Sequence, residues 1–128
     1  MLMYMEQVKI PKGVKARAKQ GKTLVGMGFK GGEALGKARA TQLLAEDTIG
    51  LDDLRIIRNW YARHVITSRP SYVEWKGSGR PVSKEYKNKI RGAVAWLLWG
   101  GDEGLAWVNA KTNLLNERYG TSYTKITV

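Results

Sequence analysis

Residues 90–108 read IRGAVAWLLWGGDEGLAWV. Apolar residues recur at the spacing of a buried helical face on both sides of Gly100 and Gly101. Two adjacent glycines interrupt a helix because each is a poor helix former. The stretch therefore predicts two apolar helices joined by a tight turn, the first over residues 84–99 and the second over residues 102–118.

Helical periodicity also extends toward the N-terminus. Residues 51–66 place Leu54 and Ile57 on a buried stripe and begin with acidic residues, which the helix dipole favours there. Residues 33–46 read as a further helix, although they contain a glycine. Residues 12–20 form a basic run of about two turns, which is too short to be a stable helix unless it docks on something.

The remaining segments read as loops and tails. Five glycines fall within residues 21–32, which predicts a flexible connector. Residues 68–82 contain two prolines and two glycines and read as the longest loop. Residues 121–128 favour either a short strand pairing with residues near Val8 or a docked, extended end.

These elements predict a single, mainly α-helical domain of four or five helices over residues 32–120. Residues 1–31 are expected to form a mobile basic arm and the glycine-rich connector. Residues 121–128 form the C-terminal tail, which contributes a short two-stranded element at the termini if it pairs.

Composition excludes several classes of protein. The 128 residues include no cysteine and one histidine, so disulfide scaffolds, thiolate metal sites and thiol catalysis are ruled out. No apolar run approaches the roughly 20 residues that span a bilayer, and the first residues lack the layout of a signal peptide. We expect a soluble intracellular protein that is not an enzyme and holds no metal or cofactor.

Charge is the strongest functional signal. Lys and Arg number 22 against 11 Asp and Glu, a net charge of +11. The excess lies mainly in residues 1–40 and residues 69–91, which favours an acidic partner such as nucleic acid or an acidic protein surface. The residues expected to contact that partner are Lys9, Lys12, Lys15, Arg17, Lys19, Lys22, Trp75, Lys76, Arg80, Lys84, Lys87 and Arg91.

Tryptophans divide into two groups. Trp96, Trp99 and Trp107 have apolar neighbours at helical spacing, so burial in the core explains them better than base stacking. Trp75 lies on the basic, glycine-rich loop and is the better candidate to contact a ligand.

Catalytic motifs are weak. Gly21-Lys22-Thr23 lacks the earlier glycine and the strand of a phosphate-binding loop, and the GxGxxG at residues 26–31 lacks the βαβ context of a dinucleotide site. A nuclease-like ExK element at Glu74 and Lys76 remains an alternative that Mg²⁺-dependent cleavage would test. A helix-turn-helix over residues 84–118 is disfavoured because its second helix carries few groove-reading side chains.

Three motifs resemble a small module encoded by tailed bacteriophages. They are ARATQL at residues 38–43, ARH at residues 62–64 and AWLLWGGDEGLAW at residues 95–107, and the resemblance covers about residues 12–109. The chain departs from the module after ARH, where members continue with an acidic, lysine-rich stretch. The resemblance implies a location near head and virion proteins and no established chemistry.

Charge and resemblance together predict a phage structural or virion-associated protein. Its basic arm and loop would bind packaged nucleic acid or a capsid-type surface, with oligomerisation in an assembly possible. The alternative is a nonspecific DNA- or RNA-binding protein that acts in the infected cell.

Overall fold

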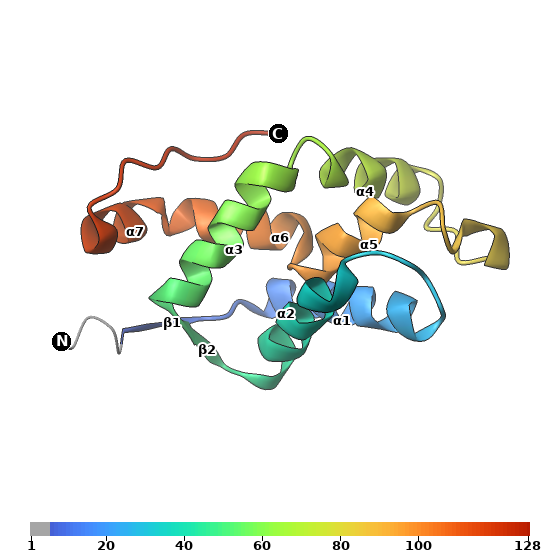
Figure 1. Ribbon diagram of the computed structural model, residues 1–128, viewed down its shortest axis with the longest axis horizontal. Coiled ribbons are helices and arrows are strands. Elements are labelled where there is room, and N and C mark those ends of the chain that lie inside the picture. Colours follow the sequence, from blue (N-terminus) through green and yellow to red (C-terminus); the bar gives the residue numbers. More distant parts are fainter. Residues whose placement is uncertain (1–5) are drawn as a thin grey trace.

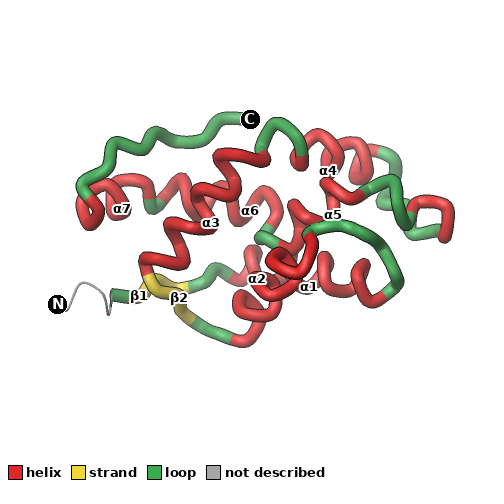
Figure 2. Tube along the Cα trace, viewed as in Figure 1, coloured by secondary structure: helices red, strands yellow, loops and turns green. Residues whose placement is uncertain are grey.

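The computed structural model describes residues 6–128 and is mainly helical, as expected, with seven α-helices in this part of the chain (Figures 1 and 2). In chain order the elements are β1 (Gln7–Lys9), α1 (Lys12–Gly26), α2 (Glu33–Ala45), β2 (Thr48–Gly50), α3 (Leu51–His64), α4 (Ser68–Gly77), the 3₁₀ helix η2 (Lys84–Tyr86), α5 (Arg91–Leu98), α6 (Gly101–Ala110) and α7 (Thr112–Tyr119). The sequence predicted four or five helices. The structure has more because the predicted loop contains α4 and because the helix predicted over residues 102–118 is divided into α6 and α7.

Helix α5 forms the centre of the molecule. It packs against α1, α2, α4 and α6, and Figure 1 places it between α1 and α4. Ala93, Val94, Trp96, Leu97 and Leu98 are all fully buried. A helix that is apolar around most of its circumference is stable only when it is enclosed on all sides, and α5 satisfies that condition.

The helix predicted over residues 12–20 is present and docks on the body, so the predicted mobile arm is wrong for residues 6–26, and the connector is limited to residues 27–32. Residues 12–26 form one helix whose Val14, Ala18 and Leu24 lie in the core. Gly21 is also buried, and a Cβ there would lie 2.8 Å from the backbone nitrogen of Leu98. This glycine permits close approach of α1 to α5 and does not confer flexibility.

The two-stranded element pairs differently from the expectation. Strand β1 is antiparallel to β2, with Val8 opposite Ile49. Residues 121–128 instead run as an extended segment without strand pairing. Asn116 and Asn109 hold it through bonds to backbone atoms of Tyr123 and Ile126 at 2.8–2.9 Å. The docked alternative for the tail therefore applies.

The predicted loop over residues 68–82 is wrong for its first ten residues, which form α4. Pro70 is the third residue of this helix, where a proline has no helical hydrogen bond to lose and its fixed φ suits the first turn. Only residues 78–90 are irregular apart from η2, so the helix predicted over residues 84–99 begins seven residues late, at Arg91. The helix predicted over residues 102–118 is interrupted at Lys111, which separates α6 from α7.

Candidate anion-binding surface

Residues of the WGGD motif build the fold around α5. The Trp96 indole donates to Asp102 at 2.9 Å, and Arg69 pairs with the same carboxylate at 3.1 Å. The Trp99 ring stacks on Trp60 with centroids 4.8 Å apart. The motif thus ties α3 and α4 to the turn between α5 and α6.

The ARATQL motif has a similar structural part. Arg39 lies 3.2 Å from the Asp53 carboxylate, and Gln42 donates to that carboxylate at 3.0 Å. The Arg39 guanidinium also lies 5.3 Å from the centre of the Trp99 ring. The motifs that carry the resemblance therefore position helices, and a binding function falls to the rest of the surface.

His64, from the ARH motif, stacks on Trp60 with ring centroids 4.8 Å apart. Burial and the neighbouring Arg63 lower the pKa of the imidazole below its ordinary 6.5. The side chain is therefore mainly neutral at pH 7 and adds little to the positive charge of the surface.

Three of the predicted binding residues on α1 are engaged within the protein. Lys15 donates to the Leu43 carbonyl at 2.8 Å, at the C-terminal end of α2, where the helix dipole favours a cation. Arg17 lies 3.7 Å from the Glu103 carboxylate, and Lys22 donates to the Thr41 hydroxyl at 2.7 Å. The remaining two on α1, Lys12 and Lys19, and Lys9 on β1 are exposed and form no ion pair within residues 6–128.

The sequence placed Trp75 on an exposed loop, but it lies in α4 and is buried. Its side chain is 3% exposed, and the indole donates to the Pro81 carbonyl at 3.0 Å. This bond ties the loop after α4 back onto the helix. Trp75 is therefore a core residue that shapes the surface from beneath.

A dense cluster of unpaired positive charge lies at the end of the molecule where two connectors meet. Residues 27–32 and 76–91 contact each other directly: the Lys30 amide donates to the Lys87 carbonyl at 2.9 Å. Figure 1 shows these connectors beyond the C-terminal ends of α1 and α4. We call this surface the basic end; its charged side chains are Lys30, Lys76, Arg80, Lys84, Lys87, Lys89 and Arg91, with Glu85 as the one acidic residue of the two connectors.

None of the seven basic side chains forms an ion pair with a residue among 6–128, and six of them are exposed. Lys89 lies 5.9 Å from the centre of the Tyr86 ring, a cation–π contact that does not neutralise its charge. Clustered like charges repel one another, so an acidic partner relieves a cost that the free protein carries. The list of binding residues predicted from the sequence omitted Lys30 and Lys89. Lys30 was omitted because the glycines around it indicated a flexible connector, whereas this connector packs beside residues 84–91.

The structure does not place the residues of the nuclease-like alternative in the arrangement that a metal-dependent nuclease needs. Glu74 and Lys76 lie on a helix rather than a strand, and residues two apart on a helix point in different directions. Asp53 is held by Arg39, as described above, and Asp52 accepts a hydrogen bond from the Tyr119 hydroxyl.

A helix-turn-helix would use α6 as its recognition helix. Five of the ten residues of α6 are buried in the core.

Comparisons with protein-family models, curated proteins and solved structures find no match. In the part of the chain that the structure describes, no three His, Asp or Glu side chains are grouped as a metal site. No described helix combines the length and the apolar character that a bilayer crossing requires.

Proposed function

We propose that this chain is a structural or virion-associated protein of a tailed phage, and that its basic end binds an acidic partner. The observation that carries the binding proposal is the group of seven basic side chains that form no ion pair with any residue of the described part of the chain. The resemblance of three motifs to a phage module supports the location. Packaged nucleic acid and a capsid-type protein surface are the two acidic partners that fit this chemistry.

The location is tested on purified phage particles from a density gradient. Many copies of the protein in the particle fraction would support the virion proposal, and absence from that fraction would remove it. Particles emptied of nucleic acid separate the two partners, because a protein that contacts the capsid stays bound when the genome is gone.

Binding is tested by titrating duplex DNA at several salt concentrations. If about six phosphates are neutralised, the affinity falls roughly a thousandfold between 50 and 200 mM salt. The variant Lys84→Gln/Lys87→Gln/Lys89→Gln should reduce the slope of log K against log salt by about 3, since each phosphate contact contributes about 0.9. A salt-independent affinity would exclude nucleic acid as the partner.

The matched control is Lys37→Gln/Lys111→Gln/Lys125→Gln, which removes the same charge from residues outside the basic end. It should change the slope much less. Equal effects of the two triple variants would mean that net charge, and not the basic end, determines binding.

The second candidate is nonspecific binding to DNA or RNA in the infected cell. The burial of α6 favours this candidate over sequence-specific recognition, because connectors and a short 3₁₀ helix present the basic side chains. Such a surface contacts phosphates and carries no base-reading helix. Recovery of the protein on nucleic acid in infected cells, together with its absence from particles, would select this candidate.

A further inference from the structure

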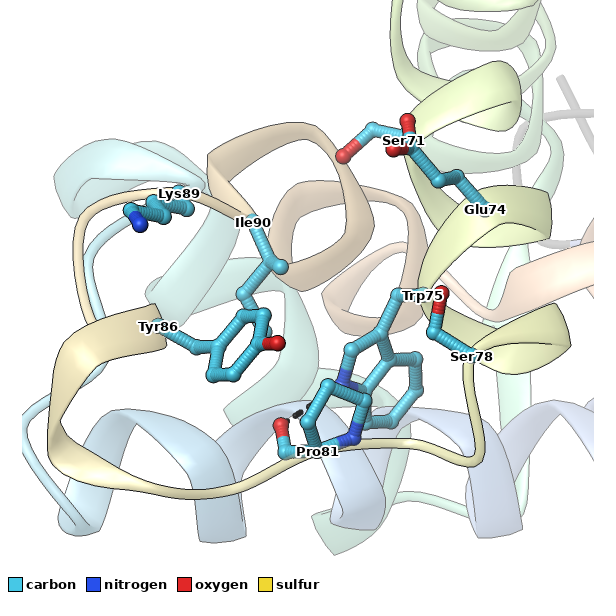
Figure 3. A pocket seen from close by; sticks show the side chains of 8 residues that line it. All are labelled: Ser71, Glu74, Trp75, Ser78, Pro81, Tyr86, Lys89 and Ile90. Atoms are coloured by element: carbon cyan, nitrogen blue, oxygen red, sulfur yellow. Dashed lines mark hydrogen bonds between the residues drawn. The ribbon is translucent and has the colours of Figure 1, made fainter.

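A small pocket opens within the basic end, between the C-terminal half of α4 and the loop that contains η2 (Figure 3). Its volume is about 150 Å³. Trp75, Pro81 and Ile90 provide apolar walls, and Tyr86 lies across the hollow from Trp75. A cavity of this volume admits a single six-membered aromatic ring such as benzene.

Two polar side chains that border the pocket, Glu74 and Tyr86, have no side-chain hydrogen-bond partner within residues 6–128. The Glu74 carboxylate also forms no ion pair there. Ser71 is already committed, since its hydroxyl accepts a hydrogen bond from the Ala93 amide at 3.0 Å. In Figure 3 the Tyr86 hydroxyl points into the hollow, and Glu74 extends from α4 toward its Ser71 side.

We propose that this pocket binds one pyrimidine base of a single-stranded nucleic acid, with cytosine preferred, an inference that rests on the proposed nucleic-acid binding by the basic end. The base would lie against the Tyr86 ring, and the phosphates beside it would contact the surrounding lysines. Stacking on an aromatic side chain combined with a positively charged surface is the usual basis of single-strand binding.

Cytosine is preferred because of the hydrogen-bonding character of Glu74. An ionised carboxylate only accepts hydrogen bonds, and the cytosine N4 amino group donates them. Thymine and uracil present a carbonyl oxygen at the same position, which a carboxylate repels. A purine has two fused rings, so only one of them would fit within the hollow and the other would protrude into solvent.

A duplex cannot use the pocket without releasing a base from its stack, which costs free energy. Single strands should therefore bind more tightly than duplexes of the same phosphate count. This distinguishes the pocket from the basic end alone, because a purely electrostatic surface favours the higher charge density of the duplex.

The test measures the affinity of the full chain for short single-stranded oligonucleotides of cytosine, thymine or adenine, and for a duplex, at one salt concentration. We expect cytosine to exceed thymine by about tenfold, in line with a single specific base contact. Glu74→Gln should bring the two affinities together, since an amide both donates and accepts. The control Glu46→Gln makes the same charge change at an exposed residue outside the basic end and should preserve the preference.

Tyr86→Leu should weaken single-strand binding by about tenfold and leave duplex binding unchanged, because stacking is lost and the lysines remain. Free cytidine monophosphate should bind far more weakly than the strand; equal affinity would indicate a small-molecule site and overturn the strand proposal. Equal affinities for all sequences, unaffected by either variant, would overturn the pocket while a steep salt slope still supported the proposed function. Absence of binding to any nucleic acid would overturn the pocket and the nucleic-acid part of that function together.

Discussion

The Tyr61 hydroxyl occupies the space beside Gly104 where any larger residue would place its Cβ. A Cβ on Gly104 would lie 2.1 Å from this oxygen. The hydroxyl itself lies 2.8 Å from the Gly101 carbonyl and 3.1 Å from the Trp99 carbonyl. Tyr61 therefore fastens α3 to the turn that joins α5 and α6.

Gly104→Ala should lower the free energy of unfolding by about 1–3 kcal/mol or more, because the added methyl group overlaps a fixed hydroxyl. Tyr61→Phe should lower it by about 1–3 kcal/mol, since buried carbonyls lose their donor. In the double variant the effect of Gly104→Ala should be smaller than in the wild type, because the clashing oxygen is absent. Urea unfolding of the four proteins measures this coupling.

Gly26→Ala is the control for this cycle, because nothing lies within 4 Å of a Cβ at Gly26. It should leave stability unchanged or raise it slightly. Strict additivity of Tyr61→Phe and Gly104→Ala would contradict the contact.

Alkaline pH should destabilise the protein through Tyr61. Burial, with smaller contributions from Asp102 and Glu103, raises the pKa of Tyr61 well above its ordinary 10.0. The unfolded chain then loses this proton first, so the stabilisation is complete below pH 10 and declines as the pH rises above it. The decline amounts to at most about 1.4 kcal/mol per pH unit for this one group.

Urea midpoints measured between pH 8 and pH 11 check this expectation, and Tyr61→Phe should show a shallower decline. Some decline should remain, because burial and a hydrogen bond to Asp52 raise the pKa of Tyr119 to about 12. An identical profile for the two proteins would show that Tyr61 does not contribute.

Sequence patterns predicted α2 and α3 to within two residues at each end. In α3 the apolar residues lie on one face, whereas α2 buries Arg39 and exposes Leu35, so its prediction depended on helix-forming residues more than on a clean apolar face. The sequence also predicted the break at Gly100 and Gly101. Their φ values of 121° and 65° suit glycine far better than other residues, so the local sequence alone determines this turn.

The errors arise where one residue type serves different purposes. Gly21 and Pro70 read as loop residues, yet the first permits a helix contact and the second lies in the first turn of α4. A contact between α1 and α5 joins residues about 75 positions apart, and sequence spacing carries no information about it. For the same reason the sequence could not predict that residues 27–32 and 76–91 contact each other and form the basic end.

The charged residues of the candidate site could be listed from the sequence but not sorted. Lys15 and Lys19 lie on the same basic helix, four residues apart. One reaches the carbonyl groups at the end of α2, and the other is exposed. Only the packing of α1 against α2 separates a structural lysine from one available to a partner.

Lys15→Met should accordingly lower the free energy of unfolding by about 1–2 kcal/mol, because the C-terminal carbonyls of α2 lose a charged donor. It should change the salt dependence of DNA binding little. Lys12→Met, at an exposed position on the same helix, should alter stability by less than about 0.5 kcal/mol. Equal stabilities of the two variants in urea would refute a capping role for Lys15.

Lysine should replace Arg39 only in part. Its guanidinium contacts Asp53 and Gln42 and also lies over the Trp99 ring, and the side chain is only 9% exposed. Arg39→Met should lower the free energy of unfolding by about 1–3 kcal/mol, a range reduced from that of a fully buried pair because Asp53 is partly solvated. Arg39→Lys retains the charge but lacks the planar guanidinium, which lies over the Trp99 ring and contacts both Asp53 and Gln42. It should therefore recover only part of this stability.

Arg63→Lys provides the comparison, since Arg63 is exposed and should tolerate the change within about 0.5 kcal/mol. Combining each Arg39 variant with Asp53→Asn divides the effect between the ion pair and the ring contact. If Arg39→Lys unfolds at the wild-type urea concentration, the charge alone is sufficient and the stacking on Trp99 contributes nothing. If it unfolds midway between Arg39→Met and the wild type, the planar guanidinium holds α2 against the turn that begins at Trp99.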